Sequence, residues 1–158
     1  TDFGTAVVKE IERLEIMLDV SHSSEQVVRD VLAIAQRPLI LSHTGIHSHC
    51  STPRNISDAL MKQIADAGGL IGIGFWESAV CDISPAGVAA SIKAAVELLG
   101  PDHVALGSDY DGAVTTGFDA GDLIRLTNAL VQAGLDKTTI RKVMGENQIR
   151  FFLENLPD

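Results

Sequence analysis

The sequence predicts one α/β domain built on a parallel sheet. Short, continuously apolar runs that end in polar residues alternate with longer segments whose apolar residues recur at helical spacing. Strands that are apolar at every position are typical of a parallel sheet covered on both faces. No repeat, linker or low-complexity segment interrupts the alternation, and 158 residues are enough for one domain with a hydrophobic core.

The first elements are marked by apolar spacing and by capping residues. Apolar residues within 5–16 recur at helical spacing and predict a helix, which leads into an apolar strand over 16–21. One of the serines 23–24 is expected to cap the next helix. Pro38 ends that helix and opens the strand 38–42.

The middle of the chain continues the same alternation. A polar loop over 43–56 is followed by a helix over 57–67, which a pair of glycines ends. The apolar run 70–75 predicts a third strand, and a loop over 76–83 follows it. Ser84-Pro85 opens a helix that ends before Gly100-Pro101.

The last part of the chain holds a fourth strand and two helices. The strand is expected over 104–108, and the helices over 121–133 and 136–155. Four strands are too few for a closed (β/α)₈ barrel, which typically needs about 250 residues. The pattern therefore predicts either a small open sheet or half of a barrel. In both, functional groups gather at the carboxyl ends of the strands.

Composition excludes two classes of partner. Asp and Glu outnumber Lys and Arg by 21 to 12, the net charge is −9, and no basic run occurs, so a nucleic-acid partner is not expected. No apolar run approaches the roughly 20 residues of a membrane span. Two cysteines are too few for a disulfide framework, and neither a pair nor two free thiols would indicate the cellular compartment.

Two histidines follow neighbouring predicted strands, at the point where each strand ends. Adjacent parallel strands lie about 4.8 Å apart, so His22 and His43 can reach one metal ion. Asp109 ends the fourth strand and can face the same centre, as a ligand or as a base for a metal-bound water. Alternatively, each histidine only caps a helix or bonds a loop carbonyl. Asp109 and Asp111 lie between glycines, a pattern that also suits an ordinary turn.

The loop after the second strand is dense in candidate ligands. His47, His49 and Cys50 suggest a zinc cluster, but no second Cys/His pair stands at zinc-finger spacing. Arg54 lies in the same loop, where a guanidinium can bind a substrate carboxylate through two parallel hydrogen bonds. The alternative for Arg54 is a salt bridge to Asp58.

The third strand contains glycines and ends in aromatic residues. Gly72 and Gly74 lie within the strand rather than between a strand and a helix, so they do not form a dinucleotide-binding motif. Small residues there are expected to make room for a neighbour or a ligand. Phe75 and Trp76 can line a substrate pocket, to which Ala79 adds little.

Taken in order, these motifs resemble the membrane (renal) dipeptidase family of zinc dipeptidases. The resemblance rests on DVSHSS, PLILSHTG, C-x-x-P-R-N, GGLIGIGF, HVALGSDYDG and GENQIRFF, which follow one another over nearly the whole chain. It implies a (β/α)₈ barrel with two zinc ions at its carboxyl end. The chain would be one partial domain over 1–158, the C-terminal half of the barrel with about four βα units.

The resemblance also implies a role for four residues. His22 and His43 would bind the second zinc ion, and Arg54 would hold the carboxylate of the dipeptide. Asp109 would act in acid–base chemistry and contact the amino group of the substrate.

The remaining active-site residues of the family would lie in the N-terminal half, which these residues do not include. That half would carry an H-x-D pair, a bridging glutamate and a further substrate-binding histidine, and no H-x-D occurs in this sequence. We therefore expect zinc-dependent hydrolysis of dipeptides only when the missing half, or a second chain, completes the barrel. The alternative is a non-catalytic α/β half-barrel that binds a partner and at most one weakly held metal ion.

Overall fold

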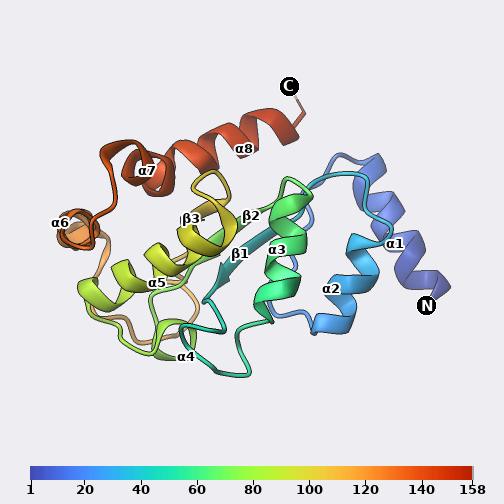
Figure 1. The fold of residues 1–158 in the computed structure, drawn as a ribbon. Coiled ribbons are helices and arrows are strands. Elements are labelled where there is room, and N and C mark those ends of the chain that lie inside the picture. The colour runs from blue at the N-terminus through green and yellow to red at the C-terminus, as the bar shows by residue number, and fades with distance from the viewer. Residues whose placement is uncertain (158) are drawn as a thin grey trace.

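The computed structural model describes residues 1–157 and has an α/β fold with a parallel sheet (Figure 1). Three described strands lie in the order β1-β2-β3 and pair in parallel: β1 (Ile40–Thr44), β2 (Leu70–Ile73) and β3 (Val104–Leu106). The helices are α1 (Asp2–Arg13), α2 (Glu25–Leu32), α3 (Asp58–Asp66), α4 (Glu77–Val80), α5 (Pro85–Leu99), the 3₁₀ turn Ala120–Asp122, α6 (Leu123–Gln132), α7 (Lys137–Arg141), the π-helical turn Lys142–Glu146 and α8 (Asn147–Asn155).

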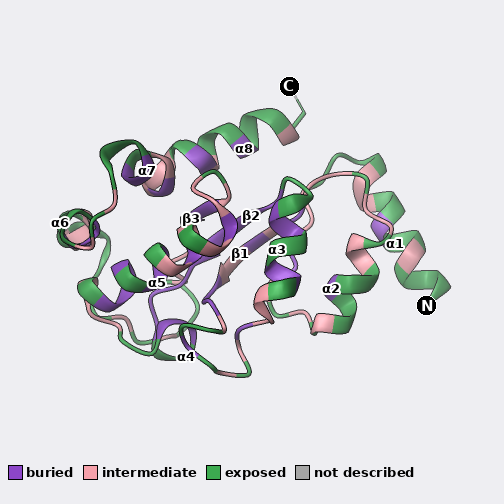
Figure 2. Ribbon diagram, viewed as in Figure 1, coloured by how far each residue is buried: buried purple, intermediate pink, exposed green. Residues whose placement is uncertain are grey.

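The sheet is covered differently on its two faces. Ile71 and Ile73 of β2 belong to the main core, which includes buried side chains of α3 and α5. The alternating residue Leu70 lies in a second cluster with Ala105 of β3 and Phe151 of α8. Burial is concentrated along the sheet and on the helix surfaces that face it (Figure 2). The apolar runs of the sequence therefore form the buried strands, and the helices that pack on each face of the sheet complete the core.

The predicted strand 16–21 is wrong. In this segment only Asp19 pairs with β1, through an isolated parallel bridge to Ile40. The Asp19 carboxylate accepts the backbone N–H of Ser42 (3.1 Å) and of Ser21 (2.9 Å). The Asp19 side chain therefore binds the backbone N–H groups that further strand pairing would use. As a result, the sheet has three strands among the described residues instead of four.

Two helical predictions also need correction. The loop expected over 76–83 contains the short helix α4, and the single helix expected over 136–155 is divided into three parts. The division occurs because Gly145 has a non-helical backbone conformation (φ 159°) within the π-helical turn. Two helix starts agree with the expected caps: the hydroxyls of Ser24 and Ser84 accept the N–H groups of Val27 and Gly87.

A β-bulge interrupts β1 where the histidine follows. Leu41 pairs with Ile71 and Thr44 with Ile73, so both Ser42 and His43 lie opposite one residue, Gly72. The Ser42 carbonyl oxygen projects over the neighbouring strands, and a Cβ atom on Gly72 would lie 2.0 Å from it. The expectation that glycines in this strand make room for a neighbour is confirmed. Bulges re-aim a side chain, and this one sets the direction of His43.

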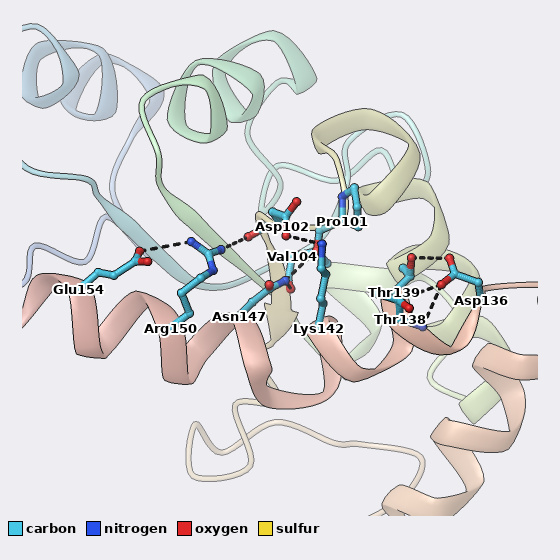
Figure 3. A network of polar contacts seen from close by, with 10 residues as sticks. All are labelled: Pro101, Asp102, Val104, Asp136, Thr138, Thr139, Lys142, Asn147, Arg150 and Glu154. Atoms are coloured by element: carbon cyan, nitrogen blue, oxygen red, sulfur yellow. Dashed lines mark hydrogen bonds and ion pairs between the residues drawn. The ribbon is translucent and has the colours of Figure 1, made fainter.

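The outer edge of β3 is bonded by the last helix. Asn147 donates from Nδ2 to the carbonyl oxygens of Pro101 (2.7 Å) and Val104 (2.8 Å), as Figure 3 shows. Gln148 donates from Nε2 to the carbonyl oxygen of Leu106 (3.1 Å). Side chains of α8 therefore bind edge carbonyls of β3 that another strand would otherwise use.

An ion pair joins the π-helical turn to the segment before β3, and it leads to a prediction about the pH dependence of stability. Lys142 Nζ lies 2.6 Å from Asp102 Oδ1, and this hydrogen bond holds the pKa of Asp102 below its usual value. A carboxyl with a lowered folded-state pKa stabilises the fold above its unfolded pKa and loses that contribution as pH falls through the folded value. Asp102→Asn should therefore lower the free energy of unfolding by about 0.5 kcal/mol at neutral pH, and the difference should vanish in acid.

Urea unfolding of the two proteins from pH 7 to pH 2.5 measures this effect. In a Lys142→Met background, Asp102→Asn should cause no further loss, because the partner is already gone. An equal loss in both backgrounds, or a difference that persists at low pH, would assign the effect to something other than the ion pair.

Candidate active site

The side chains of His22 and His43 meet at the carboxyl end of the sheet. Their Nε2 atoms are 2.8 Å apart, and their ring centroids 4.7 Å apart. Two nitrogens on one tetrahedral zinc ion lie about 3.3 Å apart when each Zn–N bond is about 2.0–2.1 Å long. The pair therefore fits one shared ion after a shift of a few tenths of an ångström, and neither Nε2 is turned toward a loop carbonyl.

Two of the candidate residues have a left-handed backbone. His22 has φ 62° and Asp109 has φ 59°. This conformation is uncommon for residues other than glycine, although His and Asp adopt it more readily than most. Such backbone conformations cluster at functional sites. Asp111, two residues further on, is exposed in the same loop.

Asp109 is close enough to influence two other candidate residues. Burial lowers the pKa of His43, and the negative charge of Asp109 opposes that shift. Burial also lowers the pKa of the Arg54 guanidinium, again opposed by Asp109. Among residues 1–157, no three His, Cys, Asp or Glu side chains form a group that could hold a metal ion. Asp109 is therefore not a third metal ligand in this arrangement, although its charge acts on both His43 and Arg54.

Arg54 is anchored above the same edge. Its Nη2 donates to the carbonyl oxygen of His43 (2.7 Å), and its guanidinium lies 5.3 Å from the ring centroid of Trp76. The alternative salt bridge to Asp58 is not formed within the described chain, where Asp58 accepts the backbone N–H of Ser48 (3.2 Å). Such anchoring leaves the other N–H groups of the guanidinium to bind a ligand.

Trp76 belongs to this site and Phe75 does not. The Trp76 ring lies 5.8 Å from the His43 ring, and it fills the space over Gly74, where a Cβ atom would be 2.1 Å from the indole. Phe75 is fully buried and packs against Phe118, with ring centroids 5.0 Å apart. The aromatic wall predicted from the sequence therefore consists of the tryptophan alone.

The loop that carries Arg54 is held in place by buried bonds. Asn55 Oδ1 accepts the N–H of Gly45 (2.8 Å), and Nδ2 donates to the carbonyls of Cys50 and Ala79 (both 2.9 Å). A disulfide joins Cys50 to Cys81, beyond β2. Both the oxygen and the nitrogen of the Asn55 amide are bonded, so the loop is attached to Gly45, directly after β1, and to Ala79 in α4.

Two hollows open beside Arg54. The larger has a volume of about 460 Å³ and is lined by serines at the start of α2 and by the loop, including Thr52 and Arg54. The smaller, about 210 Å³, is lined by His22 and Arg54 among others. The guanidinium of Arg54 therefore lines a hollow that His22 also lines.

Comparison with known proteins identifies the family. Residues 1–155 match the family model described as membrane dipeptidase, peptidase family M19. The chain belongs to the M19 membrane dipeptidase family. The resemblance predicted from the motifs is thus confirmed.

Solved structures show the same fold as this M19 chain. One is a metallopeptidase from Rhodobacter sphaeroides, liganded with a phosphinate mimic of the dipeptide L-Ala-D-Ala. It is 31% identical with a TM-score of 0.89, over 98% of this chain and 47% of that one. An amidohydrolase from Pseudomonas aeruginosa is 26% identical with a TM-score of 0.86, over 98% and 57%.

Curated relatives agree and are also longer than this M19 chain. An uncharacterised protein in the pqqA 5′ region of Klebsiella pneumoniae is 32% identical over 95% of this chain and 59% of its own length. Dipeptidase ataJ of Aspergillus terreus is 34% identical over 85% of this chain and 35% of its own length. The chain thus spans roughly a third to three fifths of the proteins it resembles.

The zinc cluster considered for the loop of the M19 chain is wrong. His47 Nδ1 is 3.1 Å from the carbonyl oxygen of Asn55, and its Nε2 is 3.3 Å from Ser51 Oγ. The sulfur of Cys50 is in the disulfide, and His49 is exposed. These residues shape the loop and do not converge on a common centre.

Sequence reasoning missed three polar residues behind the histidine pair of the M19 chain. Ser42 donates its hydroxyl to Asp19 Oδ2 (2.5 Å), and His43 Nδ1 lies 2.8 Å from Ser42 Oγ. Partial burial raises the pKa of Asp19, but hydrogen bonds from Ser42 and Ser21 outweigh it and hold that pKa below its usual value. A serine directly before each histidine, in DVSH and LSH, was the available signal.

Within residues 1–157, no helix is both long and apolar enough to cross a membrane.

Proposed function

We propose that this chain supplies the C-terminal half of the active site of a zinc-dependent dipeptidase, in a (β/α)₈ barrel that a second half completes. The observation that carries the proposal is the convergence of His22 and His43, with Nε2 atoms 2.8 Å apart beside Arg54. The M19 family match and the metallopeptidase neighbours support a metal-dependent peptidase reaction.

The need for a second half has support of two kinds. The chain covers only 47% of the Rhodobacter sphaeroides metallopeptidase. In addition, large apolar side chains are exposed on the outer helices α1 and α8 and at the residue that follows each, where further structure would cover them. These side chains are Phe3, Val7, Leu14, Ile149, Phe152, Leu153 and Leu156.

The residues present fit two of the ligands of a zinc ion. His22 and His43 would hold it through Nε2, and the remaining ligands would come from the other half, because open catalytic sites use three protein ligands. When bound, zinc lowers the pKa of water and polarises a peptide carbonyl.

The other candidate residues of this chain would bind the substrate and move the proton. Arg54, held on the His43 carbonyl, would bind the carboxylate of a dipeptide with its free N–H groups. The Asp109 carboxylate would contact the amino group of the substrate, take a proton from the attacking water and pass it to the leaving amine.

The alternative is a non-catalytic half-barrel that binds a partner and at most one weakly held metal ion. One observation favours it: within the described residues, two histidines converge without a third ligand. The two proposals differ in what a second half would add, which is activity in the first case and only association in the second.

Reconstitution tests the proposal. The chain would be co-expressed with the part of the Rhodobacter sphaeroides metallopeptidase that it does not cover, and the assembly, the reconstituted enzyme, would be isolated by size-exclusion chromatography. We expect no zinc-dependent hydrolysis of L-Ala-D-Ala by the chain alone and clear hydrolysis by the reconstituted enzyme. An assembled complex that binds zinc but hydrolyses no dipeptide would favour the non-catalytic alternative.

Arg54→Lys should weaken substrates that carry a free C-terminal carboxylate. The charge remains but the planar pair of donors is lost, and each good charge-assisted bond contributes about 1.5–3 kcal/mol. In the reconstituted enzyme, KM for L-Ala-D-Ala should rise by roughly tenfold or more. A dipeptide amide, which lacks the carboxylate, should show no such change, and equal effects on both substrates would make Arg54 a structural residue only.

A further inference from the structure

The carboxylate of Asp19 organises the end of β1 through three hydrogen bonds. Its Oδ1 accepts the backbone N–H groups of Ser21 (2.9 Å) and Ser42 (3.1 Å), and its Oδ2 accepts the hydroxyl of Ser42 (2.5 Å). The two oxygens therefore have different partners: Oδ1 accepts only backbone N–H groups, and Oδ2 accepts the hydroxyl of Ser42, which also contacts His43.

These contacts determine where each proton lies. Because the Ser42 hydroxyl has a single proton and the carboxylate of Asp19 can only accept, that proton points to Oδ2. Ser42 Oγ then acts as acceptor toward its other neighbours, His43 Nδ1 (2.8 Å) and Ser21 Oγ (3.1 Å). His43 must accordingly carry its proton on Nδ1. Its lone pair then lies on the Nε2 atom that faces His22, where in the metal-free chain it accepts the His22 Nε2–H (2.8 Å).

We propose that Asp19 is a positioning residue that acts through Ser42 to hold His43 in the Nδ1–H tautomer, with Nε2 free to bind a metal ion. The inference deepens the proposed function, since it names what prepares one of the two histidines. It also makes Ser42 a proton-orienting residue rather than a strand residue only.

Asp19→Asn separates this role from a structural one. The amide oxygen of asparagine can keep both backbone N–H bonds, so the link between the two segments survives. The amide NH₂ must then occupy the place of Oδ2, where it donates to Ser42 Oγ. The Ser42 proton must then point to His43 Nδ1 or to Ser21 Oγ. The bond that fixed the Nδ1–H tautomer is lost in either case, so His43 should shift toward the tautomer with its proton on Nε2, which has no lone pair facing His22.

The experiment measures the tautomer directly in the metal-free chain. Nitrogen-15 NMR of the histidine side chains should show His43 protonated on Nδ1 in the wild type and a clear shift toward the Nε2–H tautomer in Asp19→Asn. Zinc affinity, measured by competition with a chelating dye, should fall by about 10–100-fold, the usual cost of losing an outer-sphere partner of a ligand. Ser21→Ala is the matched control, because it removes a neighbouring hydroxyl from the same network but leaves the Asp19–Ser42–His43 contacts intact.

A second variant covers the case in which Asp19→Asn fails to fold. Ser42→Ala leaves the backbone bonds to Asp19 in place but removes the hydroxyl, so His43 should populate both tautomers. The inference is overturned if His43 keeps the Nδ1–H tautomer in both variants that fold, or if Ser21→Ala changes the tautomer as much as they do. Since the tautomer is read without metal or substrate, it is independent of whether the reconstituted enzyme hydrolyses dipeptides.

Discussion

Replacing His43 with alanine is expected to lower kcat/KM of the reconstituted enzyme for L-Ala-D-Ala by at least about 10³-fold, because the proposed metal ion would lose one of the two ligands that this chain is proposed to offer. A metal ion contributes several kcal/mol to the stabilisation of transition-state charge. One ligand fewer also weakens the binding of the ion itself, so zinc stoichiometry and activity should fall together.

His49→Ala is the matched control for that loss. His49 lies in the loop after the same strand but is exposed and makes no side-chain contact with the histidine pair in the described chain. Activity and zinc content should therefore stay near those of the wild type. If His43→Ala retained full activity with bound zinc, the histidine pair would not be the metal site, and the proposed mechanism would be wrong.

Asn147→Leu should cause the largest loss of stability among single changes considered for this chain. Asn147 is 1% exposed, and its amide satisfies the carbonyls of both Pro101 and Val104. Leucine has a similar volume, so the loss comes from two acceptors left without a donor rather than from a cavity. Each unsatisfied buried group costs about 1–3 kcal/mol, which predicts a loss of roughly 2–4 kcal/mol in the free energy of unfolding.

Urea denaturation followed by circular dichroism measures this loss, with Asn155→Leu as the control on the same helix. Asn155 is only half-buried, and its amide donates to a single carbonyl, that of Phe151 (2.9 Å). That change should cost less than about 1 kcal/mol. Similar losses in the two variants would mean that Asn147 does not fasten β3 as the contacts indicate.

The sequence predicted most of the helices and the position of the candidate site for clear physical reasons. Helical spacing and serine caps are local signals, and residues that follow parallel strands must gather at one edge. The segment 16–21 was mistaken for a strand because an apolar run indicates burial but not pairing. What ended its pairing was the side chain of Asp19, whose partner Ser42 is 23 residues away.

Other parts of the site depend on contacts that no local pattern contains. The bulge at Ser42 and His43 arises from the register of two strands, and the disulfide depends on where two distant loops meet. Asn55 is an ordinary loop asparagine in sequence, yet it binds three backbone groups. The roles of His22, His43, Arg54 and Asp109 stay predictions, and the variants above test those of His43 and Arg54.

The covalent link between Cys50 and Cys81 has a consequence for how the two halves would divide recognition and chemistry. It closes the segment around Arg54 within this chain alone, so the conformational entropy of ordering that segment is lost during folding and not when a substrate or a second half arrives. Recognition of a carboxylate would thus be pre-organised in one piece, while assembly would decide only when chemistry begins. In such a divided barrel, this chain would determine which substrates bind, and assembly with the second half would determine whether they react.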